Sequence, residues 1–390
     1  MRVRLLALWC VSVGLLAVSA GGCGPSTSGG GGRPMGAQTS GPPNMGTSGG
    51  GVQRDPLGYS FSLAQVNSVS GGTVTALAGV PNSASDSLVA HGPLQQVDRL
   101  SPGQPLSLET NFTAGTNDLA PLGGAVFAAT ADPALNGTGD VFRRVEPTPG
   151  NPTWSSVLDT NDREATVAAL SSANQVVAAT GGEGASGTLW TLDGSTLAIV
   201  SSQSLGAEVP TASVEFPENS GDVFVGTTSN AAGGSRASLL RVSGGAVQTL
   251  NLPSAGVQPG VREEVTALAR APSSTGVIQL AVAVGRFDLT SGAPLGGTVY
   301  LSDGATFTPV VTLATNDAPT ALAFADNTLY VGSAIGQLLY LDDAGTPQPE
   351  PGLPSLTRID SLLARDAKTL LIGGRDANGA VAVTRTGNTP

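Results

Sequence analysis

The side chains of this chain that could do chemistry are mostly carboxylates and asparagines, and they recur in one pattern. The tripeptide Thr-Asn-Asp occurs at 116–118, 160–162 and 315–317, each time close to a short apolar run. Acidic residues stand at comparable places before other apolar runs. The full set is Asp118, Asp162, Glu208, Glu264, Asp317 and Asp360. If these carboxylates converge, they form an acidic funnel for a cation such as Ca²⁺, or for a basic or polyhydroxy ligand.

Ordinary turn chemistry is the alternative explanation of the same residues. Asn and Asp side chains bond to nearby backbone groups and are common in turns. Arginines also stand beside the acids, at Arg163, Arg262 and Arg358, and would neutralise part of their charge. The sequence leaves the turn and the ligand-site interpretations open.

Several other classes of site are excluded or disfavoured. The chain has one histidine, His91, so a multi-histidine metal site is excluded, and no G-x-S-x-G elbow lies near it for a Ser-His-Asp site. No phosphate-binding G-x-x-x-x-G-K-[ST] motif is present. The net charge is −11, and Lys368 is the single lysine. Without a cluster of basic residues to contact phosphates, we expect no binding of nucleic acid.

The elements that position the acids are short and repeated. The clearest copy, residues 318–345, holds apolar runs at 320–324, 328–332 and 337–341, separated by turn residues. Runs of about five residues that are rich in Val, Tyr and Thr predict an antiparallel meander. Weaker copies recur, with predicted first strands at 74–78, 122–125, 166–170, 212–216, 265–269, 320–324 and 359–364.

Seven units of roughly 48 residues, most of them four-stranded, predict an all-β protein, a seven-bladed β-propeller, with six or eight blades as alternatives. Aromatic residues recur on the third strands, at Phe142, Trp190, Tyr300 and Tyr340, where blades splay apart. The last unit ends too early to form a fourth strand. The alternating segment 58–63, before the first unit, is therefore predicted to complete that blade and close the ring.

The third and sixth units carry a shared motif. A short run and a polar turn lead to LYVG or VVAATGG, then glycine, then LLYLD or TLWTLD. This motif resembles the sensor propellers of bacterial two-component regulators and the WD-repeat and quinoprotein-like propellers. The resemblance implies the architecture alone. The Trp-Asp pairs and tryptophan docking motifs of those families are absent from the sequence, so no site residue is transferred.

The N-terminus has the parts of a secretory signal: Arg2 and Arg4, an apolar run over residues 5–18, and small residues before Cys23. The run is too short to span a bilayer, which needs about 20 residues. Small residues immediately before a cysteine resemble the lipobox of bacterial lipoproteins, although Ala20 stands where that family usually has leucine. The resemblance implies cleavage before Cys23 and lipidation of its thiol.

These features predict three parts: a signal peptide at 1–22, a lipidated cysteine with a Gly/Ser/Pro-rich tether at 23–55, and the propeller at 56–390. The second cysteine, Cys10, would be lost with the signal, so the mature chain forms no internal disulfide. We expect an exported, monomeric protein, held at the cell envelope by the lipid on Cys23.

The expected function is binding of an envelope protein or a small polar ligand, with no cofactor other than a possible Ca²⁺. A metal-dependent hydrolase or lactonase at the channel mouth is the alternative. A purely structural envelope protein is a third class, and the fold alone does not decide among them.

Overall fold

In the computed structural model, the described residues are β-strands, turns and bends. They comprise residues 53–54, 60–66, 72–92, 95–131, 140–160, 164–182, 186–229, 234–253, 256–272, 278–325, 327–342 and 344–387. The predicted signal peptide, Cys23 and Asp162 lie outside these residues. The described residues contain no helix long and apolar enough to cross a membrane.

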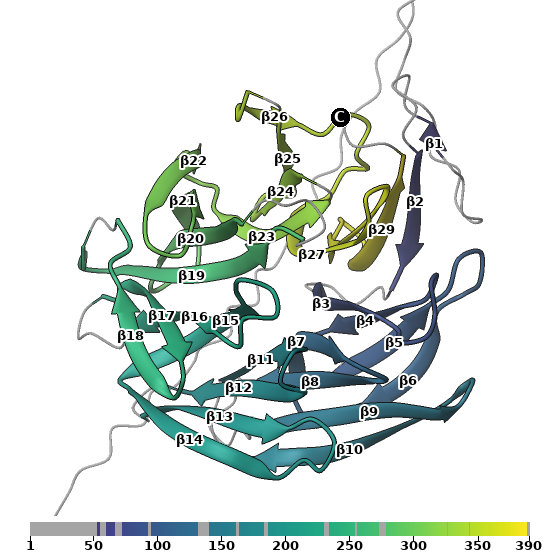
Figure 1. Cartoon of the computed structure of the whole chain (residues 1–390). Helices are drawn as coiled ribbons and strands as arrows, with labels where there is room; N and C mark the ends of the chain where they lie inside the picture. Colours follow the sequence, from purple (N-terminus) through teal and green to yellow (C-terminus); the bar gives the residue numbers. More distant parts are fainter. Residues whose placement is uncertain are drawn as a thin grey trace, which may run out of the picture. The chain divides into compact units, whose positions relative to one another are not determined.

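Seven antiparallel sheets lie around a common centre, which confirms the predicted seven-bladed propeller (Figure 1). Each inner strand contacts the inner strands of both neighbouring blades, and the last contacts the first. Blades are numbered here by these inner strands, in chain order. The inner strands are β3 (Val74–Gly79), β7 (Gly115–Leu122), β11 (Glu164–Leu170), β15 (Glu208–Glu215), β19 (Val261–Arg270), β23 (Pro319–Ala325) and β27 (Arg358–Asp366).

The other strands follow outward within each blade. The second strands are β4 (Ser87–His91), β8 (Ala125–Ala131), β12 (Gln175–Gly181), β16 (Val223–Ser229), β20 (Leu280–Asp288), β24 (Thr328–Ser333) and β28 (Thr369–Arg375). The third strands are β5 (Gln96–Leu100), β9 (Asp140–Thr148), β13 (Gly187–Asp193), β17 (Ala237–Ser243), β21 (Pro294–Ser302), β25 (Leu338–Leu341) and β29 (Ala380–Thr386). The outer strands are β6 (Ser107–Asn111), β10 (Asn151–Asp159), β14 (Ile199–Gly206), β18 (Ala246–Leu250), β22 (Phe307–Leu313), β26 (Pro347–Pro349) and β2 (Ser60–Gln65).

The ring closes through the start of the described chain. Strand β2 pairs with β29, from Ser60 opposite Thr386 to Gln65 opposite Val381, and so completes blade 7. Phe61 of β2 is buried in the apolar core between blades 6 and 7. The predicted closing strand is therefore confirmed. Strand β1 (Gln53–Arg54) pairs with β2 and adds a short fifth strand from residues that the sequence assigns to the tether.

One predicted strand is wrong. Residues 122–125 do not form the inner strand of blade 2, because Gly123 and Gly124 form the turn between β7 and β8. Gly123 has φ +56°, a conformation that favours glycine. The inner strand lies earlier, at β7, and Asp118 is consequently inside a strand rather than in a linker.

The second strands carry small residues where blades approach most closely. A Cβ on Gly373 would lie 2.5 Å from Cγ1 of Val74 in blade 1, and one on Gly332 would overlap Ile359 of blade 7. Ala and Gly at this level let the inner strands converge. The aromatic residues predicted to fill the wider space lie on the third strands, where Tyr300 is buried and Phe142 stacks on Phe112.

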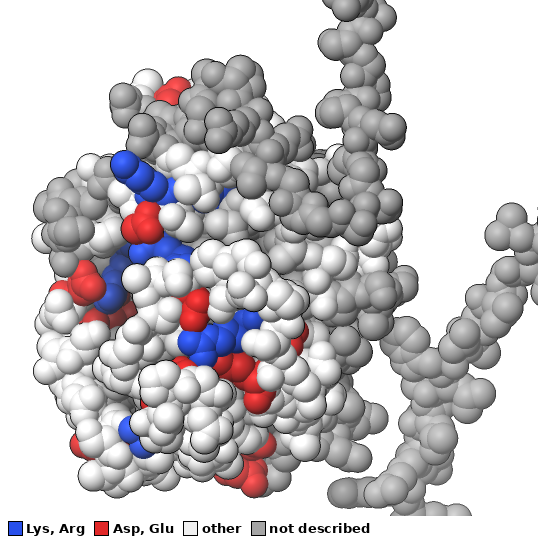
Figure 2. Space-filling model, turned by 90° about the vertical axis from the view of Figure 1, so that its right-hand side faces the viewer, with Lys and Arg blue, Asp and Glu red and all other residues white. Residues whose placement is uncertain are grey.

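Ion pairs join blades farther from the centre. Arg144 of blade 2 is fully buried and contacts Glu109 of blade 1, with Nε 2.6 Å from Oε2. Arg385 of blade 7 contacts the buried Glu350, which follows β26, at 2.5 Å. Deleting one partner of such a pair leaves a buried charge and is costly. On the side of the molecule in Figure 2, acidic and basic residues lie in mixed groups, not in separate patches.

Candidate binding site at the channel mouth

The inner strands of six blades each contain a β-bulge at the same level. A bulge inserts one extra residue and re-aims its side chain. Strand β11 of blade 3 pairs with β12 without interruption. The extra residues are Thr75, Asn117, Thr211, Thr266, Thr320 and Asp360.

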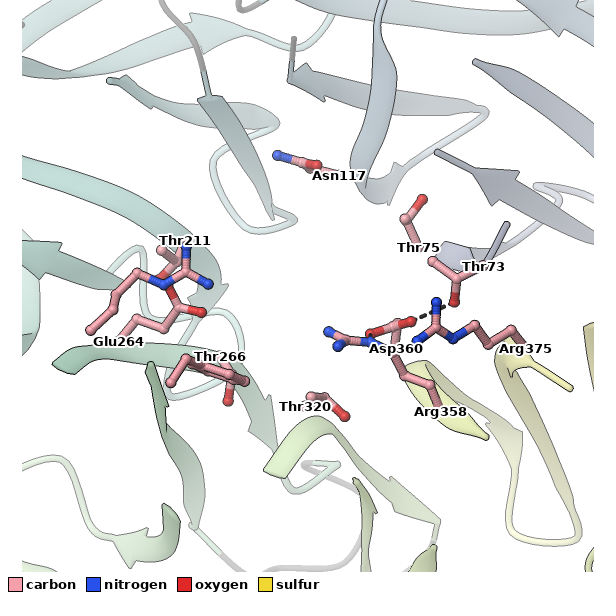
Figure 3. Close-up of a pocket in the computed structure, with 12 residues that line it drawn as sticks. Thr73, Thr75, Asn117, Thr211, Glu264, Thr266, Thr320, Arg358, Asp360 and Arg375 are labelled. Carbon is pink, nitrogen blue, oxygen red and sulfur yellow. Dashed lines mark hydrogen bonds and ion pairs between the residues drawn. The ribbon is translucent and has the colours of Figure 1, made fainter. Parts of the chain in front are cut away.

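All six bulge residues line one cavity of about 460 Å³. Its other lining residues are Thr73, Arg262, Glu264, Phe287, Arg358 and Arg375. Figure 3 shows side chains from opposite sides of the ring facing this space. Arg262 and Arg358 stand at the starts of β19 and β27, so the cavity is the mouth of the central channel, on the face where inner strands begin. We call it the mouth cavity.

A narrower chamber of about 150 Å³ adjoins the mouth cavity and shares its six bulge residues. Beyond them its lining becomes apolar, with alanines followed by Leu77, Leu268, Leu322 and Leu362. The channel thus changes with depth from charged, to hydroxyl-lined, to aliphatic.

Hydroxyl groups link neighbouring blades at this level. Thr75 donates to the carbonyl of Thr116 at 2.5 Å, Thr211 to Val265 at 2.5 Å, and Thr266 to Pro319 at 2.7 Å. Thr320 donates to the carbonyl of Ile359, and Ser361 donates to that of Val74 at 3.1 Å. Each acceptor belongs to the next blade. Because each hydroxyl already donates its proton to a carbonyl, only its oxygen lone pairs remain for a ligand. The threonines therefore act as hydrogen-bond acceptors toward the cavity.

A carboxylate makes the corresponding link between blades 2 and 3. Asp118 accepts the backbone N–H of Val167 in blade 3 at 3.2 Å, and that of Leu119 at 2.8 Å. Its side chain lines the narrower chamber. Burial raises the pKa of Asp118 to about 6, although the two N–H donors act in the opposite direction.

The mouth cavity contains two ion pairs and one further arginine. Nε of Arg262 lies 3.1 Å from Glu264, and Nε of Arg358 lies 2.5 Å from Asp360. Both pairs join positions two apart on a strand, which share a face. Asp360 also accepts the hydroxyl of Thr73. Arg375, at the end of β28, lines the cavity and forms no ion pair with another described residue.

Burial raises the pKa of the Glu264 carboxyl, while the guanidinium groups of Arg262 and Arg358 act against this rise. Arg358 belongs to blade 7 and Glu264 to blade 5, so charges interact across the mouth. Two of the arginines that the sequence places beside the acids, Arg262 and Arg358, therefore pair with them, and Arg163 lies outside the described residues.

The remaining predicted site residues lie elsewhere. Glu208 accepts the hydroxyl of Thr227 within blade 4 at 2.6 Å. Asp317 is buried before β23 and accepts the N–H of Ala318 at 2.8 Å, and burial raises its pKa. The Thr-Asn-Asp copies are therefore not equivalent, because Asn117 is a bulge residue inside β7 whereas Asn316 precedes its strand. Of the six acids, Glu264 and Asp360 share the mouth, and Asp118 lines the chamber.

The mouth is less acidic than a funnel of six carboxylates, since three arginines face two carboxylates. Within the described parts of the chain, no three His, Cys, Asp or Glu side chains are grouped closely enough to hold a metal ion. Calcium binding stays a prediction, with no such cluster to support it.

The single histidine lies away from the mouth. His91 is fully buried in blade 1, with Nε2 3.0 Å from Oδ2 of Asp98, and does not line the mouth cavity.

The sequence prediction missed the threonines and Arg375. A signal for the threonines exists, because the segments 74–77, 265–268 and 319–322 read VTAL, VTAL and PTAL. These segments look like ordinary strand formers until the bulge shows where their threonines point. No comparable signal marks Arg375, which reaches the mouth from a second strand.

The inter-blade hydroxyl bonds predict different effects for two changes at one position. Thr320→Val should lower the free energy of unfolding by about 1–2 kcal/mol, because the buried carbonyl of Ile359 loses its donor. Thr320→Ser keeps the hydroxyl and should cost less. Urea unfolding of both variants measures the difference, and equal losses would show that the bond contributes nothing.

The raised pKa of Asp118 predicts a pH dependence of stability. The folded state holds this proton more tightly than the unfolded chain, whose Asp pKa is about 4. The contribution is therefore fully present below pH 4 and is lost as the pH rises through about 6, by up to about 3 kcal/mol. Asp118→Asn should remove this component of the urea-unfolding profile.

A matched control is Asp342→Asn. Asp342 is partly exposed, and hydrogen bonds, first that from the N–H of Thr346, lower its pKa. Its contribution has the opposite sign and is lost as the pH falls. If both variants changed the profile in the same direction, the assignment of the raised pKa to Asp118 would be wrong.

Comparison with known proteins identifies the fold. No protein-family model matches the sequence, and no curated protein sequence matches it. The WD40 β-propeller domain of Doa1 is similar in structure, with 9% identity, a TM-score of 0.56, and coverage of 85% of this chain and 98% of that chain. YCF48 bound to D1 peptide has 15% identity, a TM-score of 0.54, and coverage of 85% and 97%. Virginiamycin B lyase from Staphylococcus aureus has 12% identity, a TM-score of 0.54, and coverage of 84% and 99%. At these identities the likeness concerns the fold alone, one that is commonly used as a binding module.

Proposed function

We propose that this chain is an exported lipoprotein whose propeller binds a protein partner or a polar ligand at the mouth of its central channel. The mouth cavity is the observation that supports this most strongly. Its volume of about 460 Å³ is within the range of ligand pockets, which is about 300–1,000 Å³. Six of the seven blades contribute lining residues, including charges of both signs and hydroxyl acceptors.

The site is also rigidly built, which favours specific binding. The threonines that line it are held by bonds to the next blade, and both carboxylates are held by arginines. Side chains fixed before binding lose little conformational freedom on binding, so less of the interaction energy is spent on ordering. One of the structurally similar proteins, YCF48, is in complex with a peptide, so this fold does serve peptide recognition.

The envelope location rests on the sequence. A signal of this form leads to export, and a lipid on Cys23 adds roughly 0.8 kcal/mol of membrane affinity for each buried CH₂ group. The tether of about 30 residues has a typical reach of about 30 Å. The propeller would therefore work just off a membrane surface.

The hydrolase or lactonase alternative lacks a specific supporting observation. It needs a group of metal ligands, and the described residues provide no cluster of three. Binding needs only the cavity and its charges.

The anchor is tested by a pair of cysteine changes. Cys23→Ser should abolish incorporation of labelled fatty acid and release the protein from the membrane fraction, because the lipid is its attachment. Cys10→Ser is the matched control, since Cys10 lies in the predicted signal and is removed. Both effects are read by metabolic labelling and fractionation. A Cys23→Ser protein that still incorporated the label would contradict the proposed anchor.

The binding role is tested by blocking the mouth. With Cys23 lipidated, a cysteine introduced at Arg262, whose side chain is 46% exposed, is the one free thiol and can carry a bulky maleimide polymer. This label should remove the protein's chemical cross-links in envelope preparations, because it fills the mouth. The control is the same label on Leu108→Cys, on the outer strand of blade 1 and 55% exposed. Cross-links that survive the mouth label would overturn the proposal.

A further inference from the structure

We infer that the mouth cavity takes a polypeptide segment that carries a carboxylate, with apolar side chains of the same segment on an adjacent ledge. This inference rests on the proposed function, because it names the ligand class for the same site. It follows from the arginines, the hydroxyls and the apolar residues around them.

The arginines supply the donors for a carboxylate. Arg375 has no ion pair with a described residue, and Arg262 and Arg358 contact their own carboxylates through Nε. A guanidinium has five N–H donors, so the terminal nitrogens remain for a ligand. In Figure 3, Arg358 and Arg375 lie together with Asp360 at one side of the cavity, and Glu264 lies at the other. Planar bidentate binding of a carboxylate is the contact that such a group makes best.

The charge balance points the same way. The whole chain carries a net charge of −11, yet three arginines face two carboxylates in the mouth cavity. Burial also favours the neutral form of Glu264. An anionic group is therefore better placed here than over most of this acidic chain. Below the arginines, the threonine oxygens accept hydrogen bonds, which suits the N–H groups of a peptide backbone.

An apolar ledge adjoins the arginines. We define it as Leu289 and Ile335, which are 52% and 45% exposed. Strands β20 and β24 both run toward the mouth and end at Asp288 and Ser333, so Leu289 and Ile335 lie in turns on that face.

Contacts place the ledge beside the cavity. Phe287, which lines the mouth cavity, packs against Ala318 and Ala334. Leu289 donates its N–H to the carbonyl of Gly260, immediately before β19, at 2.8 Å. Leu289 and Ile335 therefore lie on the mouth face of blades 5 and 6, within two residues of groups that line the cavity or pack against its lining.

The ledge favours a polypeptide over an acidic saccharide. Sugars dock on exposed aromatic faces, whereas Phe287 is 4% exposed and the guanidinium of Arg262 lies 5.4 Å above its ring. Exposed leucine and isoleucine instead match the aliphatic side chains of a peptide. The occupant is an extended segment in which Asp, Glu or a C-terminal carboxylate is flanked by apolar residues.

The test uses the detergent-solubilised mature lipoprotein and a fluorescein-labelled peptide of alternating leucine and aspartate with a free C-terminus. Fluorescence anisotropy should show binding that weakens with salt, and no binding of the same peptide with lysine in place of aspartate.

Variants of the protein test the two parts of the site. Arg375→Gln should weaken binding about ten-fold or more, as expected for a charge-assisted hydrogen bond. Arg236→Gln, an exposed arginine outside the cavity lining, is the control and should leave binding unchanged. Leu289→Ser and Ile335→Ser should each weaken binding while leaving its salt dependence intact.

Equal binding of the acidic and basic peptides, or an Arg375→Gln variant that binds like wild type, would overturn the inference. So would an oligogalacturonate that binds through Arg375 with no effect of the ledge variants, because the ligand class would then be a saccharide. The two proposals fail separately. If the mouth label removes the envelope cross-links but the acidic peptide does not bind, the proposed function stands and this inference fails.

Discussion

The hydrogen bond from an inner-strand hydroxyl to a carbonyl of the next blade is the interaction on which this ring depends. It acts where blades converge, and its acceptors are carbonyls next to the β-bulges. The bulge also turns the threonine toward the axis. In four blades, one threonine therefore both bonds to the next blade and lines the cavity. The site cannot change shape without changing the ring, which is why its oxygens are well fixed for binding.

Packing around this level follows from the same convergence. Glycine at 332 and 373 lets Ile359 and Val74 of the next blade approach, whereas aromatic rings fill the wider space on the third strands. Charged residues are few. Several form ion pairs between blades, as Arg144 and Glu109 do, and a small group lies at the mouth. Closure by β2 ties the beginning of the described chain to its last blade, so strand pairing between distant parts of the sequence holds the ring closed.

Much of the fold could be predicted because strand length, turn residues and the spacing of the units can be read from the local sequence. The blade count and the closing strand depend on these features alone. The site was harder to predict, because a bulge shifts register by one residue without altering the apolar pattern. The Thr-Asn-Asp copies matched in composition yet fall at different registers, so Asp317 is buried beside its own strand while Asp118 faces the chamber. Arg375 enters the mouth from a second strand, a position that only the assembled ring defines.

Departures from threonine show where the ring has become specialised. In blade 7 the bulge position holds Asp360, and the hydroxyl bond to blade 1 is made instead by Ser361. The hydroxyl that bonds to the next blade therefore stands one residue later than in the other blades. The bulge position instead holds a carboxylate, which pairs with Arg358. Blade 2 has a similar exchange, since Asp118 rather than Asn117 reaches the next blade. A ring built only for stability has no use for these exchanges. The exchange in blade 7 puts Asp360 at the mouth beside Arg358 and Arg375, while Glu264 lies at the other side of the cavity, so the two sides present different charges to a ligand.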